Sequence, residues 1–139
     1  MNTPQMTEQD PRLGLTVTHR RYVPYSHAHY GGHLVDGAYA LGLFGDVATE
    51  AAIRMDGDEG LLAGYSEIRF LGPVRAGDVL EATVEVVRVG RRSRELRCTA
   101  RVVCRAEPER GPSAARVVDP PETVVEAIGT VVVPAADER

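Results

Sequence analysis

Residues 25–60 constrain the fold most, because they are the only long part of the chain with helical periodicity. Asp36 is a residue type that often caps helix starts, and apolar residues follow it almost all round the predicted helix as far as Arg54. A helix that is apolar on nearly every side is typically enclosed by other elements rather than lying on a surface. We therefore predict a largely buried helix over residues 36–54.

Two carboxylates interrupt the apolar pattern of this helix. Asp46 and Glu50 are four residues apart and share one flank. Like charges at this spacing repel, and partial burial raises a carboxyl pKa, so such a pair suits a general base or acid near neutral pH. The alternative is a narrow exposed stripe without a chemical role.

The rest of the chain predicts an antiparallel sheet. Gly90 to Ser93 forms a hairpin turn between two segments that alternate apolar and polar residues, and residues 106–121, with four prolines, are expected to be a long excursion. The predicted strands cover residues 13–23, 61–74, 78–89, 95–105 and 123–133. This order is an α+β pattern in which a curled sheet can wrap one apolar helix.

The 139 residues are enough for one domain. We expect a mobile arm over residues 1–12, a single domain over 13–135 and a C-terminal tail over 136–139. Five strands in a single layer leave the sheet edges and outer face uncovered, which predicts at least a homodimer.

Composition excludes several classes of protein. The formal net charge of −4 argues against nucleic-acid binding, and the absence of a long apolar run or a signal segment predicts a cytoplasmic protein without a membrane partner. Cys98 and Cys104 are six apart in one predicted strand, about 20 Å, so they cannot pair within the chain. His27, His29 and His33 with Asp36 match no recognised zinc spacing, and we predict no metal site.

Several ordered motifs between about residues 20 and 105 resemble the 3-aminobutyryl-CoA ammonia lyases, a hotdog-fold family. They are Ala28-His-Tyr-Gly-Gly, Leu34-Val-Asp-Gly-Ala, Leu43-Phe-Gly-Asp-Val-Ala-Thr-Glu50, Asp56-Gly-Asp-Glu-Gly-Leu61 and Phe70-Leu-Gly-Pro-Val-Arg-Ala-Gly-Asp78. The resemblance implies a curled antiparallel five-stranded sheet wrapped around one long central helix. One departure is His33, where the lysine-fermentation enzymes are expected to have asparagine.

The resemblance also implies a substrate. It is an acyl thioester, on coenzyme A or a carrier protein, to whose β-carbon an amine is added or from which it is removed. The amine is ammonia or an amino acid such as glycine. No separate cofactor is expected, because coenzyme A or phosphopantetheine is part of the substrate. A homodimer or higher oligomer, up to a hexamer, is compatible with this assignment.

Loss of ammonia needs a base for the α-proton, stabilisation of the thioester oxyanion and an acid for the nitrogen. We assign the base to Glu50, with Asp46 raising its pKa or exchanging the nitrogen proton, although the two roles could be reversed. His29 and Tyr30 are candidates to bind or protonate the amine. Their alternatives are a turn histidine and a core-edge aromatic residue.

Backbone N–H groups near Gly37 are candidates to polarise the thioester carbonyl, because the first turn of a helix has free donors at its positive end. Gly37 would let the substrate approach closely, and Asp36 is more simply a helix cap. We add Gly31, Gly32 and His33 to the predicted substrate-binding residues.

Arginines surround the hairpin turn, and their guanidinium groups suit the phosphates of coenzyme A. Arg91 and Arg92 are the main candidates, with Arg88 and Arg94 beside them. A solvated hairpin tip is the alternative.

Three functions remain open. The first is an ammonia lyase or amine-adding enzyme acting on enoyl thioesters. The second is a thioesterase, because a helix-borne carboxylate and the same oxyanion site also support hydrolysis. The third is a non-catalytic binding module for acyl thioesters, which the paired acids disfavour.

Overall fold

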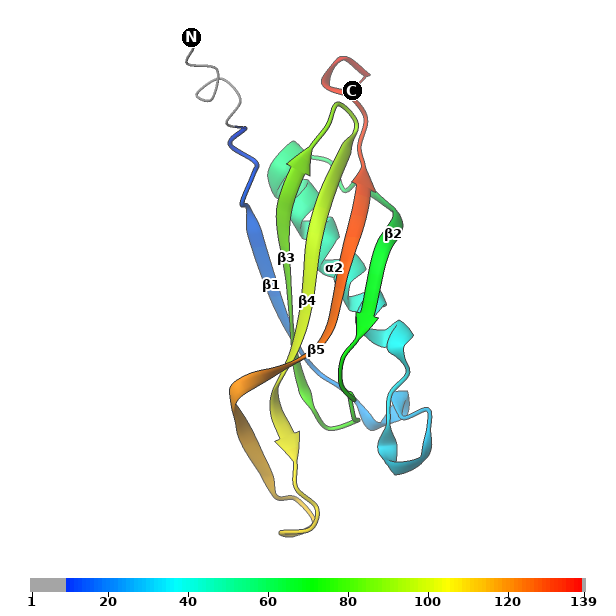
Figure 1. Ribbon diagram of the computed structural model, residues 1–139, viewed down its shortest axis with the longest axis vertical. Helices are drawn as coiled ribbons and strands as arrows, with labels where there is room; N and C mark the ends of the chain where they lie inside the picture. Colours follow the sequence, from blue (N-terminus) through cyan, green and yellow to red (C-terminus); the bar gives the residue numbers. More distant parts are fainter. Residues whose placement is uncertain (1–9, 139) are drawn as a thin grey trace.

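The computed structural model describes residues 10–138, in which one long helix lies against a curled five-stranded antiparallel sheet (Figure 1). The sheet order is β1-β3-β4-β5-β2, and the helix is α2 (Gly37–Asp56). The strands are β1 (Thr16–Tyr22), β2 (Leu61–Phe70), β3 (Val79–Val89), β4 (Ser93–Ala106) and β5 (Ala115–Val132). Short 3-10 helices are η1 (Tyr25–His27), η2 (Gly31–His33) and η3 (Ala136–Glu138). The predicted hotdog fold is confirmed.

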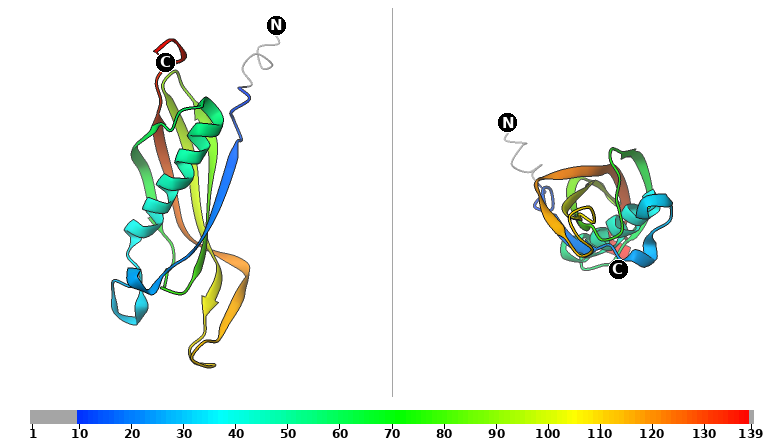
Figure 2. Two further views of the ribbon diagram at one scale, coloured as in Figure 1. Left: turned by 180° about the vertical axis from the view of Figure 1, so that it is seen from behind. Right: turned by 90° about the horizontal axis from the view of Figure 1, so that it is seen from below.

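The core fills the space between the concave face of the sheet and one face of α2 (Figure 2). Phe44, Val47 and Ala51 of the helix are fully buried against sheet residues such as Leu80 and Leu96. Apolar burial of this kind is the main favourable contribution to folding. The alternation predicted for the central strands therefore points the apolar side chains toward α2.

The opposite face of α2 is not covered by its own chain. Its exposed residues recur every three or four positions, at Ala38, Gly42, Asp46, Thr49 and Ile53. The prediction of a helix enclosed on all sides is therefore wrong for a single chain, because the sheet wraps only one side of it. The prediction failed because the residues on the open side are mostly apolar or small, as core residues are.

The two ends of α2 are held differently. At its start, Asp36 is the N-cap as predicted, and its Oδ1 accepts a hydrogen bond from the Tyr39 amide at 3.2 Å. At its end, Gly57 adopts the left-handed conformation with φ 64°, which favours glycine. Both capping motifs fix the helix limits close to those predicted.

Residues 106–121 form the predicted long excursion, and the segments on either side of its turn pair as strands. Strands β4 and β5 continue past the body of the sheet as a two-stranded projection, the β4–β5 arm (residues 103–119), in which Cys104 pairs with Val117 and Ala106 with Ala115 (Figure 1). Pro120 and Pro121 fall where the ladder shifts register, so neither interrupts a paired position. A proline-rich composition therefore does not exclude pairing in the arm.

Residues 1–9 of the predicted N-terminal arm lie outside the described residues. Arg12, in the described part, donates from Nη1 to Asp56 Oδ1 at 2.8 Å and so ties this segment to the end of α2. Cys98 and Cys104 are free thiols, as predicted. Between residues 10 and 138, no helix is both long and apolar enough to cross a membrane.

Candidate active site

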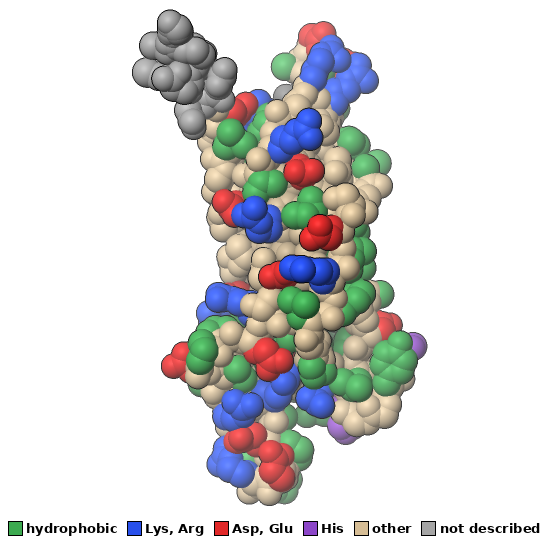
Figure 3. Space-filling view, in the orientation of Figure 1, with side chains coloured by type: hydrophobic (Ala, Val, Ile, Leu, Met, Phe, Trp, Pro, Cys, Tyr) green, Lys and Arg blue, Asp and Glu red, His purple; other side chains and the backbone are tan. Residues whose placement is uncertain are grey.

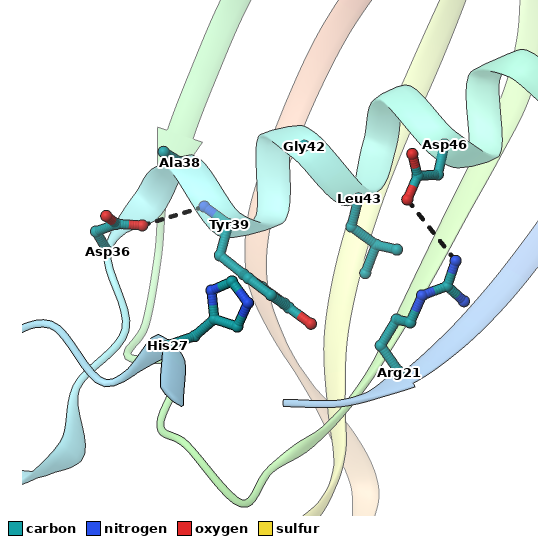
Figure 4. A pocket seen from close by; sticks show the side chains of 8 residues that line it. All are labelled: Arg21, His27, Asp36, Ala38, Tyr39, Gly42, Leu43 and Asp46. Carbon is teal, nitrogen blue, oxygen red and sulfur yellow. Dashed lines mark hydrogen bonds and ion pairs between the residues drawn. The ribbon is translucent and has the colours of Figure 1, made fainter. Parts of the chain in front are cut away.

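A cavity of about 450 Å³ follows the open side of α2 from its start and is called the helix pocket (Figure 4). Its lining residues come from β1, the loop before the helix and α2: Arg21, His27, Asp36, Ala38, Tyr39, Gly42, Leu43 and Asp46. It combines two carboxylates, an imidazole, a phenol and a guanidinium with a small apolar floor. Such convergence of polar groups in a cavity is typical of an active site.

Gly42 leaves the middle of the helix pocket open. A Cβ atom built at this position would meet no atom within 4 Å, so close packing does not explain the glycine. Glycine inside a helix costs about 1 kcal/mol of stability relative to alanine. The open space at Gly42 lets a ligand lie close to the helix backbone between the first turn and Asp46.

Tyr39 and His27 form one wall of the helix pocket, with their ring centroids 4.8 Å apart in an edge-on arrangement. Burial raises the pKa of the Tyr39 hydroxyl above its ordinary value, so this group stays protonated and can donate a hydrogen bond. Tyr39 and Arg21 were not predicted as site residues from the sequence, and His27 was considered only as a zinc ligand. The spacing of Tyr39, Gly42 and Asp46 on one helix side could have indicated Tyr39. No local pattern could have indicated Arg21.

Asp46 lies in the helix pocket, and its side chain is 66% exposed. Its Oδ2 is 3.7 Å from Arg21 Nη2 on β1 (Figure 4). This long and solvated ion pair orients the carboxylate weakly. The carboxylate remains accessible to a ligand in the pocket.

Glu50 lies one turn beyond Asp46 and is not among the residues that line the helix pocket. Its Oε1 is 2.7 Å from His19 Nε2, and its Oε2 accepts from Arg54 Nε at 2.8 Å. These hydrogen bonds, that from His19 first, lower the pKa of Glu50 below its ordinary value. The prediction that Asp46 raises the pKa of Glu50 is wrong, because the hydrogen bonds from β1 and from the next helical turn lower that pKa.

His29 and Tyr30 are exposed on the loop before α2, with their rings edge-on and 4.6 Å apart. His29 Nδ1 is 3.8 Å from Asp36 Oδ2, which draws this loop toward the start of the helix. Neither residue lines the helix pocket. Tyr30 lines a second cavity on the other side of Asp36 and Tyr39.

This second cavity, called the apolar pocket, has a volume of about 320 Å³. Apart from Tyr30, Asp36 and Tyr39, it is lined by Val35, Gly37, Ala40, Phe70, Gly72, Pro73, Val74 and Val125. Asp36 and Tyr39 line both cavities, so the start of α2 separates a polar pocket from an apolar one. A ligand with a polar reacting end and a short apolar end matches this division.

Gly37 makes a close contact within its own chain. A Cβ atom there would lie 2.5 Å from Cε1 of Phe70, so glycine is needed for the Phe70 ring to cover the first turn. The N–H groups of Gly37 and Ala38 have no acceptor within the helix, and they lie at its positive end. Free N–H groups therefore lie where oxyanion donors were predicted, and Phe70 borders them.

The predicted binding residues divide between the two ends of the molecule. Gly32 and His33 line a third cavity beside the β4–β5 arm. Arg91 and Arg92 pair with Asp137 and Glu138 near the C-terminus, at the end of the sheet where α2 finishes (Figure 1). Within one chain these two arginines therefore lie far from the helix start, and their predicted contact with the phosphates of coenzyme A stays a prediction.

The remaining predicted residues fit this division. Arg88 is exposed on β3, and Arg94 is buried in the ion pair with Asp56 and is not available for phosphate. Gly31 lies in η2, on the loop that separates the cavities. The described part of the chain contains no group of three His, Cys, Asp or Glu side chains that could hold a metal ion.

Comparison with known proteins agrees with the fold and the sequence motifs. The family model of the Thioesterase superfamily matches residues 31–109. The 3-aminobutyryl-CoA ammonia lyase of Acetoanaerobium sticklandii is 46% identical over 112 residues, which cover 81% of this chain and 89% of that protein.

Solved structures give the same result. The β-alanyl-CoA:ammonia lyase of Clostridium propionicum superposes with a TM-score of 0.84 at 32% identity, covering 91% of this chain and 90% of that chain. A hexameric thioesterase of Yersinia pestis has a TM-score of 0.69 at 15% identity, covering 91% and 92%, and so shares the fold. The chain therefore belongs to the Thioesterase superfamily of hotdog-fold proteins and, within it, to the family of the 3-aminobutyryl-CoA ammonia lyases.

Proposed function

We propose that this protein is a carbon–nitrogen lyase that adds an amine to, or removes it from, the β-carbon of a short acyl thioester. The 46% identical relative and the 32% identical structural neighbour are both named as acyl-CoA ammonia lyases. The observation that carries the proposal is the helix pocket. It joins free first-turn N–H groups to a carboxylate, Asp46, through an open space at Gly42.

In the direction of addition, the lone pair of the amine forms a bond to C3 of the enoyl thioester. The π electrons of the C2=C3 bond move toward the thioester carbonyl and give an enolate oxyanion. C2 then gains one proton and the nitrogen loses one, which restores the thioester. Elimination runs through the same steps in reverse.

The first-turn N–H groups of Gly37 and Ala38 are positioned to stabilise the oxyanion. Donors fixed at a helix start need no reorganisation when the charge develops, and loss of one such donor typically costs 10²–10³ in kcat. Asp36 keeps this turn in place, because its side chain accepts from the Tyr39 amide. The thioester carbonyl would therefore lie at the shared rim of the two pockets.

We assign the proton transfer at C2 to Asp46 rather than to Glu50, which reverses the roles assigned from the sequence. Asp46 lines the helix pocket, but it lies eight residues after Ala38, about 12 Å along the helix. The carboxylate that reaches C2 of a thioester held at one helix start would therefore be Asp46 of a second copy packed on the open side of α2. Glu50 is held by His19 and Arg54 and supports this flank of the helix.

The nitrogen proton is the second requirement. Tyr39 and His27 form the wall of the helix pocket nearest the helix start, and either can donate to an amine or accept from it. His29 and Tyr30, on the outer side of the same loop, remain candidates for capturing the amine before it enters. The amine itself is ammonia or a small amino acid such as glycine.

The acyl end of the substrate fits the apolar pocket. Phe70 closes one side of this pocket against Gly37, so we propose that it limits the acyl group to a few carbons. Both ammonia lyase relatives are named for three- or four-carbon acyl groups. Coenzyme A or a carrier protein would extend outward from the thioester sulfur.

We propose that the protein is a homodimer or a larger homo-oligomer. Strand β2 is an edge of the sheet, and apolar side chains on or next to it are exposed, including Leu61 at 69% and Phe70 at 57%. Such an edge, together with the open side of α2, is surface that a second copy commonly covers. Light scattering at micromolar concentration should show an oligomer, and a monodisperse monomer would contradict this proposal.

The function is tested with crotonyl-CoA and either ammonia or glycine, followed by mass spectrometry. A lyase yields a product heavier by the mass of the amine while the thioester is initially intact. A thioesterase, the second candidate, is favoured by the superfamily match and by the same carboxylate. Free thiol that appears without any adduct would support hydrolysis instead.

A further inference from the structure

We propose that the cavity between the β4–β5 arm and the loop before α2 binds the phosphate groups of the thioester's carrier. This cavity, called the arm pocket, has a volume of about 460 Å³. The inference rests on the proposed function, since it supposes a thioester on coenzyme A or phosphopantetheine. It assigns a ligand to a cavity that combines Arg75 and Asp78, from the Phe70–Asp78 motif, with residues of the β4–β5 arm.

One wall of the arm pocket is fixed by a buried ion pair. Asp78 is fully buried, and it accepts from Arg105 Nε and Nη2 at 3.0 and 2.9 Å. Arg105 Nη2 also donates to the Pro73 carbonyl at 2.8 Å. The charge of Asp78 is thus neutralised, and the Arg105 side chain forms a rigid surface at the base of the arm.

The lining of the arm pocket is balanced in charge, with three acids (Asp78, Glu107 and Glu109) and three arginines (Arg75, Arg105 and Arg116). Glu107 is already bound by Arg110 Nε at 2.6 Å and by Arg116 Nε at 3.2 Å, so Glu109 is the remaining acid of the lining. The guanidinium of Arg75 has no hydrogen-bond or ion-pair partner among residues 10–138. A guanidinium group has five N–H donors in one plane, and two of them can bind two oxygens of one phosphate.

The surface view shows which charged groups lie near the arm. Basic side chains lie where the arm joins the body of the sheet, next to acidic ones, and both kinds also lie at its tip (Figure 3). Phosphate recognition needs local donors rather than a basic protein, so the overall charge of −4 does not oppose it.

His33 gives a second reason to look for a ligand here. It is the non-glycine residue with positive φ in the described chain, at 62°, a conformation that costs energy and persists where the surroundings impose it. Its ring lies edge-on to Tyr25, with centroids 5.4 Å apart, on the wall that faces the arm. An imidazole held in this way can donate to a phosphate oxygen beside Arg75.

One loop connects the arm pocket to the proposed reaction site. The His33 carbonyl accepts from the Ala76 amide at 2.9 Å, which joins the loop before α2 to the segment that carries Arg75. The same loop contributes Tyr30 and Val35 to the apolar pocket. A flexible pantetheine chain can therefore run along this loop, with its thioester at the helix start and its phosphates at the arm.

The arginines of the β3–β4 hairpin are a weaker alternative. Arg91 and Arg92 each pair with an acidic residue near the C-terminus, and they lie at the far end of α2. A phosphate bound there would have to displace Asp137 or Glu138. These arginines therefore provide a matched control of the same residue type.

The test compares Arg75→Gln with Arg91→Gln on two substrates, crotonyl-CoA and crotonyl-pantetheine, which lacks phosphate. Loss of one charge-assisted contact should raise KM for crotonyl-CoA about tenfold in Arg75→Gln, with kcat unchanged. KM for crotonyl-pantetheine should not change in either variant, and Arg91→Gln should behave as wild type. A crotonyl thioester on a carrier protein is the third substrate. If Arg75→Gln raises KM more for this substrate than for crotonyl-CoA, the carrier protein is the source of the phosphate.

Two outcomes would overturn the inference while leaving the lyase function intact: an unchanged KM for both phosphate-bearing esters in Arg75→Gln, or an equal increase for the pantetheine ester. Calorimetry with adenosine 3′,5′-diphosphate separates the two proposals, since it needs no turnover. Tenfold weaker binding in Arg75→Gln would support the arm pocket even if no thioester reacted. Wild-type protein that converts none of the thioesters would count against the proposed function alone.

Discussion

The two ends of α2 differ in how their charged groups are used. At the start, Asp36 and Tyr39 border two open cavities, and the polar groups there keep access to solvent. At the end, the side chains of Asp56 and Arg94 are each only 3% exposed. Arg94 donates from Nε and Nη2 to the two Asp56 oxygens at 3.0 and 2.9 Å, and Arg12 adds a third contact.

This difference separates stability from binding along one helix. A buried charge must be fully paired, because an unpaired one costs several kcal/mol, and a fully paired group has no capacity left for a substrate. The end of α2 therefore fixes the helix against β4. The start keeps its donors and acceptors available because it is open, and its stability depends on a single cap.

The largest expected effect comes from breaking the closed end. Arg94→Ala leaves Asp56 buried with Arg12 as its remaining named partner, and breaking a buried pair in this way typically costs about 3–5 kcal/mol. Urea unfolding should show this loss in the free energy of unfolding. The neighbouring exposed arginine gives the control, since Arg91→Ala should change stability by less than about 0.5 kcal/mol. Equal effects in the two variants would show that the closed end adds no special stability.

The next largest effect should appear at the open end, in activity rather than in stability. Asp46→Asn removes the proposed base while keeping its shape, so kcat should fall by about 10² with little change in Tm. Glu50→Gln should lower kcat by less, because Glu50 lies outside the helix pocket. Exchange of the α-protons of butyryl-CoA in heavy water reports the base alone. Exchange lost in Glu50→Gln but kept in Asp46→Asn would return the base to Glu50.

A smaller effect is expected on acyl-chain selectivity, which tests the boundary between the helix pocket and the apolar pocket. Phe70→Ala removes the ring that covers Gly37 and opens the apolar pocket to longer acyl chains. Two additional buried CH₂ groups are worth about 1.6 kcal/mol, so the preference for hexenoyl-CoA over crotonyl-CoA should rise roughly tenfold. Leu71→Ala, at an exposed neighbour outside the pocket, is the control. Oligomeric state should be measured in both variants, and unchanged selectivity in a correctly assembled Phe70→Ala would refute the role of Phe70.

The smallest effect concerns Glu50 and pH. Hydrogen bonds from His19 and Arg54 lower the pKa of Glu50 in the folded protein. Glu50 therefore stabilises the fold above its unfolded pKa of about 4.3, and this contribution is lost as the pH falls through the lower folded value. Glu50→Gln should lower Tm slightly at pH 7, and the difference from wild type should shrink below about pH 4. A constant difference across this range would mean that ionisation of Glu50 does not matter for stability.

Local pattern alone predicted much of the scaffold. The helix, its Asp36 cap and the alternation of the central strands were correct, because periodicity and capping depend on residues a few positions apart. The ordered motifs between residues 20 and 105 also identified the family and the kind of reaction. The helical spacing also put Asp46 and Glu50 on one flank of the helix.

Contacts between distant residues decided the rest. His19 and Glu50 are 31 positions apart, and their hydrogen bond reverses the expected pKa shift of Glu50. The pairing of Cys104 with Val117 turns a proline-rich segment into the arm, and the burial of Arg94 removes it from any phosphate site. His33 precedes α2 and Arg75 follows β2. The two residues come together only because β2 runs back to the end of the sheet where α2 begins. The sequence therefore determined the chemical groups and the local elements, while the tertiary structure decided which groups share a cavity, because long-range packing leaves no local periodic pattern.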